Sequence, residues 1–158
     1  MPCRIFLHGF DSSSRGTKGR YFKENFPGML VPDFSGSLAE RMEKLYEILS
    51  NESEITMVGS SYGGLMASIF SLENKAKVKG LFLLAPAINL NEFNDYLDIT
   101  SDVPVILYHG TRDNVIPIDP VFERAKKCFK TLTFCRVDDD HMLHKIFRTI
   151  DWHELLNS

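Results

Sequence analysis

Three kinds of segment are missing from this sequence of 158 residues. No run of 18 apolar residues occurs, so no stretch is long enough to cross a bilayer as a helix. No block of lysine and arginine occurs either, and 18 basic against 21 acidic residues leave a formal net charge of −3, which argues against nucleic acid as a partner. The opening residues contain no apolar stretch of signal-peptide length. We therefore expect a cytoplasmic protein that binds neither membranes nor nucleic acids.

Cysteine is scarce, which argues against a disulfide scaffold and against the common zinc motifs. Cys3, Cys128 and Cys135 cannot all pair within one chain, and no C-x-x-C spacing occurs. His141 and His144 stand three residues apart, as two metal ligands on one helical turn would, but no third ligand or H-E-x-x-H sequence accompanies them. We therefore expect buried thiols in a reducing compartment, with no metal and no cofactor.

The composition is that of an ordinary globular protein, with 44% hydrophobic and 25% charged residues. A folded chain of this length buries roughly 70% of its unfolded surface, which is enough for one hydrophobic core without disulfides. No linker rich in proline, glycine and serine divides the chain into two hydrophobic halves. Residues 1–158 are therefore predicted to form a single domain.

Short apolar runs alternate with helical patterns along the whole chain. The runs are apolar along most of their length, which is typical of parallel strands covered on both faces. Helices are predicted over 38–49, where Ser37 and Glu40 form a capping-box pattern, and more weakly over 65–72, 120–129 and 142–156. Strands are predicted over 3–7, 29–31, 55–59, 80–85, 103–108 and 131–137. This alternation predicts a doubly wound α/β fold, whose ligands bind beyond the carboxyl ends of the strands.

The third predicted strand runs into the sequence Gly-Ser-Ser-Tyr-Gly at 59–63, after which a helical pattern begins. Strand, tight turn and helix are the context of a G-x-S-x-G nucleophile elbow, in which the residues two before and two after the nucleophile must be small. Ser61 has Gly59 and Gly63 at these positions, whereas Ser60 would have a valine and a tyrosine there. Ser61 is therefore the candidate nucleophile, and the alternative is a plain glycine- and serine-rich turn.

A serine nucleophile needs a histidine that accepts its proton and a carboxylate that orients the histidine. Asp113 follows the fifth predicted strand and His141 follows the sixth, which gives the chain order Ser, Asp, His of α/β-hydrolases. Taken singly, an aspartate in a turn is usually a cap and a histidine after an acidic run is usually a surface residue. One of the acids at 138–140 could also replace Asp113, but we prefer Asp113 because it has a strand end of its own.

The developing oxyanion also needs hydrogen-bond donors, for which backbone N–H groups are the usual choice. The residue after the nucleophile, Tyr62, supplies the first predicted donor. Phe10 supplies the second, because Gly9 allows the chain to turn at the end of the first predicted strand. His8 in the same segment is interpreted as structural, with a second proton carrier as the lesser alternative.

Three basic residues, Arg15, Lys18 and Arg20, follow the proposed oxyanion loop. They could bind an acidic group of a substrate, such as a carboxylate or a phosphate. We favour the simpler interpretation that they belong to a solvated helix start.

Several of these segments together resemble the α/β-hydrolase superfamily. They are Leu-His-Gly-Phe at 7–10, Gly-Ser-Ser-Tyr-Gly-Gly at 59–64, His-Gly-Thr-Arg-Asp at 109–113 with Ile-Pro at 116–117, and Asp-His at 140–141. The opening His-Gly-Phe-Asp-Ser-Ser-Ser at 8–14 and the small size resemble the YqiA-like bacterial esterases within it. The resemblance implies a three-layer α/β/α sandwich with a mostly parallel sheet of about six strands. The stretch 86–102 is too short for the cap domain of larger members, which implies an open, shallow site.

By the same resemblance, Ser61, Asp113 and His141 are the catalytic triad, and Phe10 and Tyr62 form the oxyanion hole. The predicted function is that of a serine hydrolase cleaving a carboxylic ester or thioester of a small soluble substrate through an acyl-enzyme. An acyltransferase or a peptidase could use the same triad, because specificity depends on the shape of loops. A non-catalytic binding protein is a third possibility, disfavoured because the triad residues and elbow glycines are all present. The sequence indicates neither the physiological substrate nor the oligomeric state.

Overall fold

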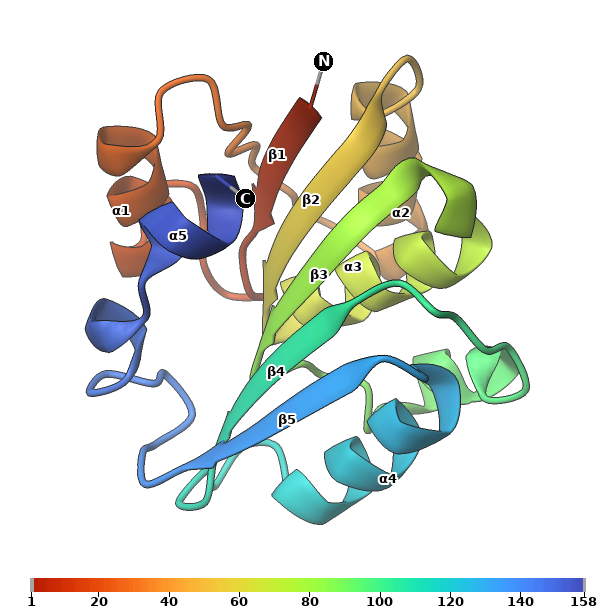
Figure 1. The fold of residues 1–158 in the computed structure, drawn as a ribbon, viewed down its shortest axis with the longest axis vertical. Coiled ribbons are helices and arrows are strands. Elements are labelled where there is room, and N and C mark those ends of the chain that lie inside the picture. Colours follow the sequence, from red (N-terminus) through yellow and green to blue (C-terminus); the bar gives the residue numbers. More distant parts are fainter. Residues whose placement is uncertain (1, 158) are drawn as a thin grey trace.

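A computed structural model describes residues 2–157 as a five-stranded parallel sheet with helices on both faces (Figure 1). The first and last residues of the predicted domain 1–158 lie outside the described residues. The strands follow one another across the sheet in chain order: β1 Pro2–Leu7, β2 Ser53–Ser60, β3 Val78–Leu84, β4 Val105–Gly110 and β5 Leu132–Val137. Each neighbouring pair is parallel. The predicted parallel α/β fold is therefore confirmed.

Three helices of the structure correspond to the predicted helices 38–49, 65–72 and 120–129, whereas no range was predicted for the first helix. The helices are α1 Thr17–Asn25, α2 Leu38–Ile48, α3 Tyr62–Glu73, α4 Ile118–Cys128 and α5 Trp152–Asn157, with short 3₁₀ helices η1 Lys75–Lys77, η2 Asn91–Tyr96 and η3 Phe147–Thr149. The predicted capping box of α2 is confirmed, because the Glu40 N–H donates to the Ser37 hydroxyl and the Glu40 carboxylate accepts the Ser37 N–H. No helix described is long and apolar enough to span a membrane.

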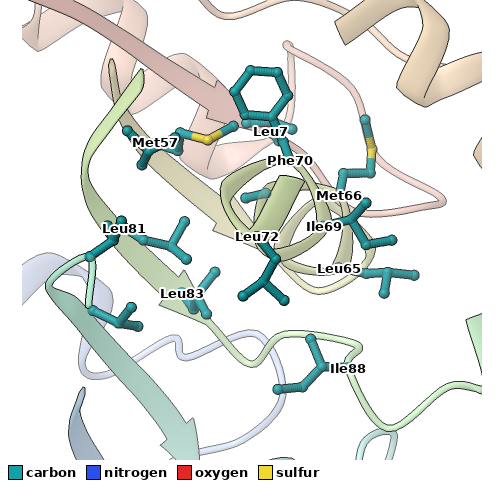
Figure 2. Close-up of a cluster of buried hydrophobic side chains, with 14 of the residues drawn as sticks. Leu7, Met57, Leu65, Met66, Ile69, Phe70, Leu72, Leu81, Leu83 and Ile88 are labelled. Atoms are coloured by element: carbon teal, nitrogen blue, oxygen red, sulfur yellow. The ribbon is translucent and has the colours of Figure 1, made fainter. Parts of the chain in front are cut away.

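Alternate residues of the strands contribute to two hydrophobic clusters, one on each face of the sheet. On one face Leu81 and Leu83 join residues of α2, α3 and α4, and Figure 2 shows both leucines in one group with the apolar side chains of α3. On the other face Phe82 joins residues of α1, α5 and the segment that leads to α5. The candidate site residues Ser61, Asp113 and His141 follow the carboxyl ends of β2, β4 and β5.

One of the six predicted strands, the strand at 29–31, is wrong. Leu30 forms only an isolated parallel bridge to Ile5, and its backbone exchanges hydrogen bonds with Arg4 and Phe6 of β1. Pro32 has no N–H to donate, so the pairing cannot continue beyond residue 31. The sheet therefore has five strands instead of about six.

The continuous helix predicted over 142–156 is also wrong, because η3 and α5 are separated by non-helical residues. Leu143 has a φ of +55°, in the left-handed region that interrupts a right-handed helix. The buried Asp139 carboxylate accepts the N–H of Ile146 at 2.8 Å, which a continuous helix would have paired with a backbone carbonyl. The apolar spacing of this segment instead places Leu143 and Phe147 in the core under α1.

Candidate active site

Ser61 lies at the sharp turn between β2 and α3, with a φ of +54° and a ψ of −114°. Positive φ strains a residue that carries a side chain, and such strain gathers at functional sites. A Cβ on Gly59 would lie 2.5 Å from the carbonyl oxygen of Gly63, and a Cβ on Gly63 would lie 2.0 Å from the carbonyl oxygen of Leu7. Both positions therefore require glycine, as expected for an elbow centred on Ser61.

The structure brings the three predicted catalytic side chains together. His141 Nε2 lies 3.2 Å from Ser61 Oγ, and His141 Nδ1 lies 2.7 Å from Asp113 Oδ2. The Asp113 side chain is fully buried, and its second oxygen accepts the N–H groups of Val115 at 2.9 Å and Ile116 at 2.8 Å. The carboxylate can thus hold Nδ1–H of the imidazole and leave Nε2 free to accept a proton.

The acids at 138–140 are occupied elsewhere. Asp138 pairs with the exposed guanidinium of Arg112, and this ion pair lowers the pKa of the Asp138 carboxyl. Asp140 binds His144 at 2.7 Å, which lowers the pKa of the Asp140 carboxyl to about 2. Asp139 accepts backbone N–H groups of the following segment. Within residues 2–157, no three histidine, cysteine, aspartate or glutamate side chains lie close enough together to hold a metal ion, around His144 or elsewhere.

A second histidine supports the Asp113 carboxylate and was not identified as a site residue from the sequence. His109 is fully buried at the end of β4, with Nε2 2.9 Å from the Ile116 carbonyl oxygen and 3.2 Å from Asp113 Oδ2. Its Nδ1 atom is buried with no hydrogen-bond partner among the described residues. Burial lowers the pKa of His109, which keeps its imidazole neutral. The signal in the sequence was its position at the end of an apolar strand, next to Gly110.

The two predicted oxyanion donors lie in segments that border Ser61. Tyr62 is the first residue of α3, and Phe10 lies in a turn closed by a hydrogen bond from Ser12 N–H to the Gly9 carbonyl. The Cβ position of Gly9 is 3.5 Å from Ser61 Cβ, so this turn packs beside the elbow. Within the described chain, neither the Phe10 nor the Tyr62 N–H donates to another residue. Neither N–H group is therefore committed to a protein acceptor among the described residues.

His8 lies just before this turn, and both of its ring nitrogens are engaged. Nδ1 lies 2.7 Å from the Gly9 carbonyl oxygen, and Nε2 accepts the Phe34 N–H at 2.9 Å. The ring is buried, which agrees with the structural interpretation of His8.

A cavity of about 500 Å³ borders Ser61 and His141. Three large hydrophobic side chains on its wall are unusually exposed: Phe10 at 53%, Val115 at 64% and Met142 at 49%. Among the described residues the one other exposed large hydrophobic side chain, that of Tyr46, is less open at 38%, so exposed apolar surface is concentrated here. Such a wall suits an apolar group of a ligand.

The interpretation of the basic stretch as a solvated helix start is correct for Arg15 and Arg20 and wrong for Lys18. Lys18 is 8% exposed, lines the same cavity and donates from Nζ to the Met142 carbonyl at 2.7 Å. Burial lowers the pKa of its ammonium group. The reason is tertiary: α1 packs against the C-terminal segment, where the Phe147 ring centre lies 5.4 Å from Nζ.

The three cysteines are free in the structure. Cys3 and Cys128 are buried as expected, whereas Cys135 is only half-buried. Burial raises the pKa of each thiol, that of Cys3 to about 11. None is an activated thiolate at neutral pH.

Comparison with known proteins identifies the fold. A family model described as the alpha/beta hydrolase fold matches residues 7–102, a range that includes Phe10, Ser61 and Tyr62 and ends before Asp113 and His141. No curated protein matches the sequence.

Solved structures share the fold at low sequence identity. Mouse alpha/beta hydrolase domain-containing protein 10 is 18% identical, with a TM-score of 0.79 over 100% of this chain and 91% of that one. Est1E from Butyrivibrio proteoclasticus, with ferulic acid bound, is 16% identical, with a TM-score of 0.78 over 99% and 89%. Esterase Pf2001 from Pyrococcus furiosus is 18% identical, with a TM-score of 0.73 over 99% and 80%.

Proposed function

The chain belongs to the alpha/beta hydrolase fold family, and on that premise we propose that it is a serine hydrolase acting on a carboxylic ester or thioester of a small soluble substrate. The observation that carries this proposal is the continuous contact from Ser61 Oγ through His141 to the buried Asp113 carboxylate. An isolated serine hydroxyl is a weak nucleophile, and this arrangement is the one that activates it.

In the proposed reaction, Ser61 Oγ attacks the substrate carbonyl carbon while His141 Nε2 takes the hydroxyl proton. The Asp113 carboxylate stabilises the imidazolium that forms. The N–H groups of Phe10 and Tyr62 bind the oxyanion of the tetrahedral intermediate. His141 returns the proton to the leaving oxygen or sulfur, and the carbonyl carbon stays bound to Ser61 as an acyl-enzyme. Water, deprotonated by His141, then releases the acid and restores the serine.

The wall of the cavity supports an ester over a more polar substrate. Phe10, Val115 and Met142 offer exposed apolar surface that an acyl or alcohol group would cover. One structural relative, Pf2001, is called an esterase, and another, Est1E, holds ferulic acid, an aromatic carboxylic acid. We place the enzyme in the cytoplasm, since free thiols fit a reducing compartment.

Turnover of p-nitrophenyl acetate by the purified chain tests this proposal, with Ser61→Ala and Ser60→Ala as a matched pair. Both changes remove one hydroxyl from adjacent residues, but only one removes the proposed nucleophile. Ser61→Ala should lower kcat more than about a thousandfold while circular dichroism and Tm stay near those of the parent. Ser60→Ala should change kcat less than about tenfold. Normal turnover by Ser61→Ala, or an equal loss in both variants, would contradict the proposal.

A further inference from the structure

Arg41 on α2 is a buried arginine without an acidic partner. Arg41 is 3% exposed, and within residues 2–157 no carboxylate lies within ion-pair distance of its guanidinium. Arginine is almost never buried unless it is paired, so this placement requires an explanation. Its Nη1 atom has no hydrogen-bond partner in the described structure, although it is out of reach of solvent.

The contacts of Arg41 converge on the two residues that we assign to the oxyanion hole. Nη2 donates to the Phe10 carbonyl at 3.3 Å. The guanidinium carbon lies 4.6 Å from the centre of the Phe10 ring and 5.3 Å from the centre of the Tyr62 ring. The two rings also touch each other edge to face, with centres 5.1 Å apart. One planar cation thus holds both residues through hydrogen-bond and cation–π contacts.

A second contact fixes the guanidinium itself. Nε donates to the Gly36 carbonyl at 3.0 Å, just before the capping box that begins α2. The turn that carries Phe10 has one hydrogen bond of its own, from Ser12 to Gly9, and the Phe10 ring is 53% exposed. The Gly9 carbonyl, which shares a peptide group with the Phe10 N–H, also lies 2.7 Å from His8 Nδ1, so this peptide group is held from the Gly9 side. Arg41 supplies a side-chain contact to the next peptide group, at the Phe10 carbonyl.

We propose that Arg41 is a positioning residue that holds the Phe10 and Tyr62 N–H groups in the geometry needed to bind the oxyanion. The inference rests on the proposed serine hydrolase function. The Gly9 contacts hold the peptide group that carries the Phe10 N–H, and the Arg41 contacts hold the Phe10 carbonyl and ring. Together they restrict the backbone dihedral angles of Phe10. Because an oxyanion hole acts through preorganised donors, a small misorientation lowers transition-state stabilisation more than substrate binding.

The test compares Arg41→Met and Arg41→Lys with Arg124→Met as a matched control. Arg124 is also partly buried and also donates to two backbone carbonyls, those of Ile88 and Leu90, but it does not contact the oxyanion residues. For each variant, kcat and KM for p-nitrophenyl acetate are measured together with Tm and with the inhibition constant of phenylboronic acid. This inhibitor forms a tetrahedral, anionic adduct on an active serine and so reports on the oxyanion hole.

Arg41→Met should lower kcat about 10- to 100-fold with KM within about threefold, and should raise the phenylboronic acid inhibition constant by a factor similar to the loss in kcat. Arg41→Lys should also lose more than about tenfold in kcat, since one ammonium cannot bond both carbonyls while lying on both rings. If Arg41→Met does not fold, the kcat and the inhibition constant of Arg41→Lys test the proposal instead. Arg124→Met should leave kcat and the inhibition constant near those of the parent even where Tm falls.

Two results would overturn the inference. One is parental kcat and boronic acid inhibition in the Arg41 variants. The other is an equal loss of kcat in Arg124→Met, which would assign the effect to general destabilisation. If either result occurs while ester turnover still depends on Ser61, the proposed function stands and only the role of Arg41 is rejected. Full turnover by Ser61→Ala would reject both the proposed function and the role of Arg41.

Discussion

Replacing Asp113 with asparagine should inactivate the enzyme by reversing the hydrogen-bond direction at His141. One carboxylate oxygen of Asp113 accepts two backbone N–H groups, those of Val115 and Ile116. An asparagine NH₂ group there would face two donors and leave both buried N–H groups unpaired, at about 1–3 kcal/mol each. The amide oxygen therefore takes this place, and the NH₂ group faces His141 Nδ1. Nδ1 must then accept, so the ring proton moves to Nε2, which can no longer take the Ser61 proton.

The expected loss is about 10⁴-fold in kcat, the size known for the same substitution in a serine protease triad. A loss of that size corresponds to about 5.4 kcal/mol in the activation free energy at about 1.36 kcal/mol per tenfold. The assay is p-nitrophenyl acetate turnover between pH 6 and 9, with the free energy of unfolding measured in urea. Asp138→Asn is the matched control, because it removes a nearby carboxylate charge that binds Arg112 and leaves His141 untouched.

Retention of more than about a tenth of parental kcat by Asp113→Asn would refute this reasoning. So would an equal loss in Asp138→Asn, which would attribute the effect to the local negative charge instead of the imidazole tautomer.

Three further predictions follow from burial and packing. Burial holds the pKa of His109 below its ordinary value, so below about pH 6.5 the unfolded chain binds a proton that the folded chain does not. Between pH 6.5 and 5 this group should lower the free energy of unfolding by up to about 1.4 kcal/mol per pH unit, and His109→Gln should weaken the pH dependence of that free energy, measured by urea unfolding. Gly63→Ala should lower the free energy of unfolding by about 1–3 kcal/mol or more, because its Cβ would lie 2.0 Å from a backbone oxygen. Gly80→Ala, whose Cβ would have no atom within 4 Å, should lower it far less, and equal urea midpoints for the two variants would contradict this prediction. Met142→Ser should lower the ratio of kcat/KM for p-nitrophenyl octanoate to that for the acetate about tenfold, whereas Tyr46→Ser, an exposed apolar residue outside the cavity, should leave the ratio unchanged.

The sequence predicted those features that depend on neighbouring residues. The elbow was found because Gly59 and Gly63 must both be small around Ser61, and this requirement is set within five residues. The capping box of α2 is equally local, since Ser37 and Glu40 satisfy each other. Asp113 and His141 were identified because parallel strands bring their carboxyl ends to one edge of the sheet, so that position along the chain indicates position in space.

Features that depend on distant contacts were missed. The periodic apolar residues after His141 suggested one helix, but the Asp139 carboxylate and the left-handed Leu143 end that pattern. Lys18 reads as a surface residue until α1 is seen to pack against the C-terminal segment. Arg41 lies in an amphipathic helix pattern that gives no hint of its contact with Phe10, which is 31 residues away in the chain.

The most direct test of an activated nucleophile at Ser61 is the intact mass of the purified chain after incubation with a fluorophosphonate probe. The account predicts a single adduct on the parent chain, mapped by peptide fragmentation to Ser61, and no adduct on a folded Ser61→Ala variant. An unlabelled parent chain that is folded, or an adduct that persists in Ser61→Ala, would contradict the account.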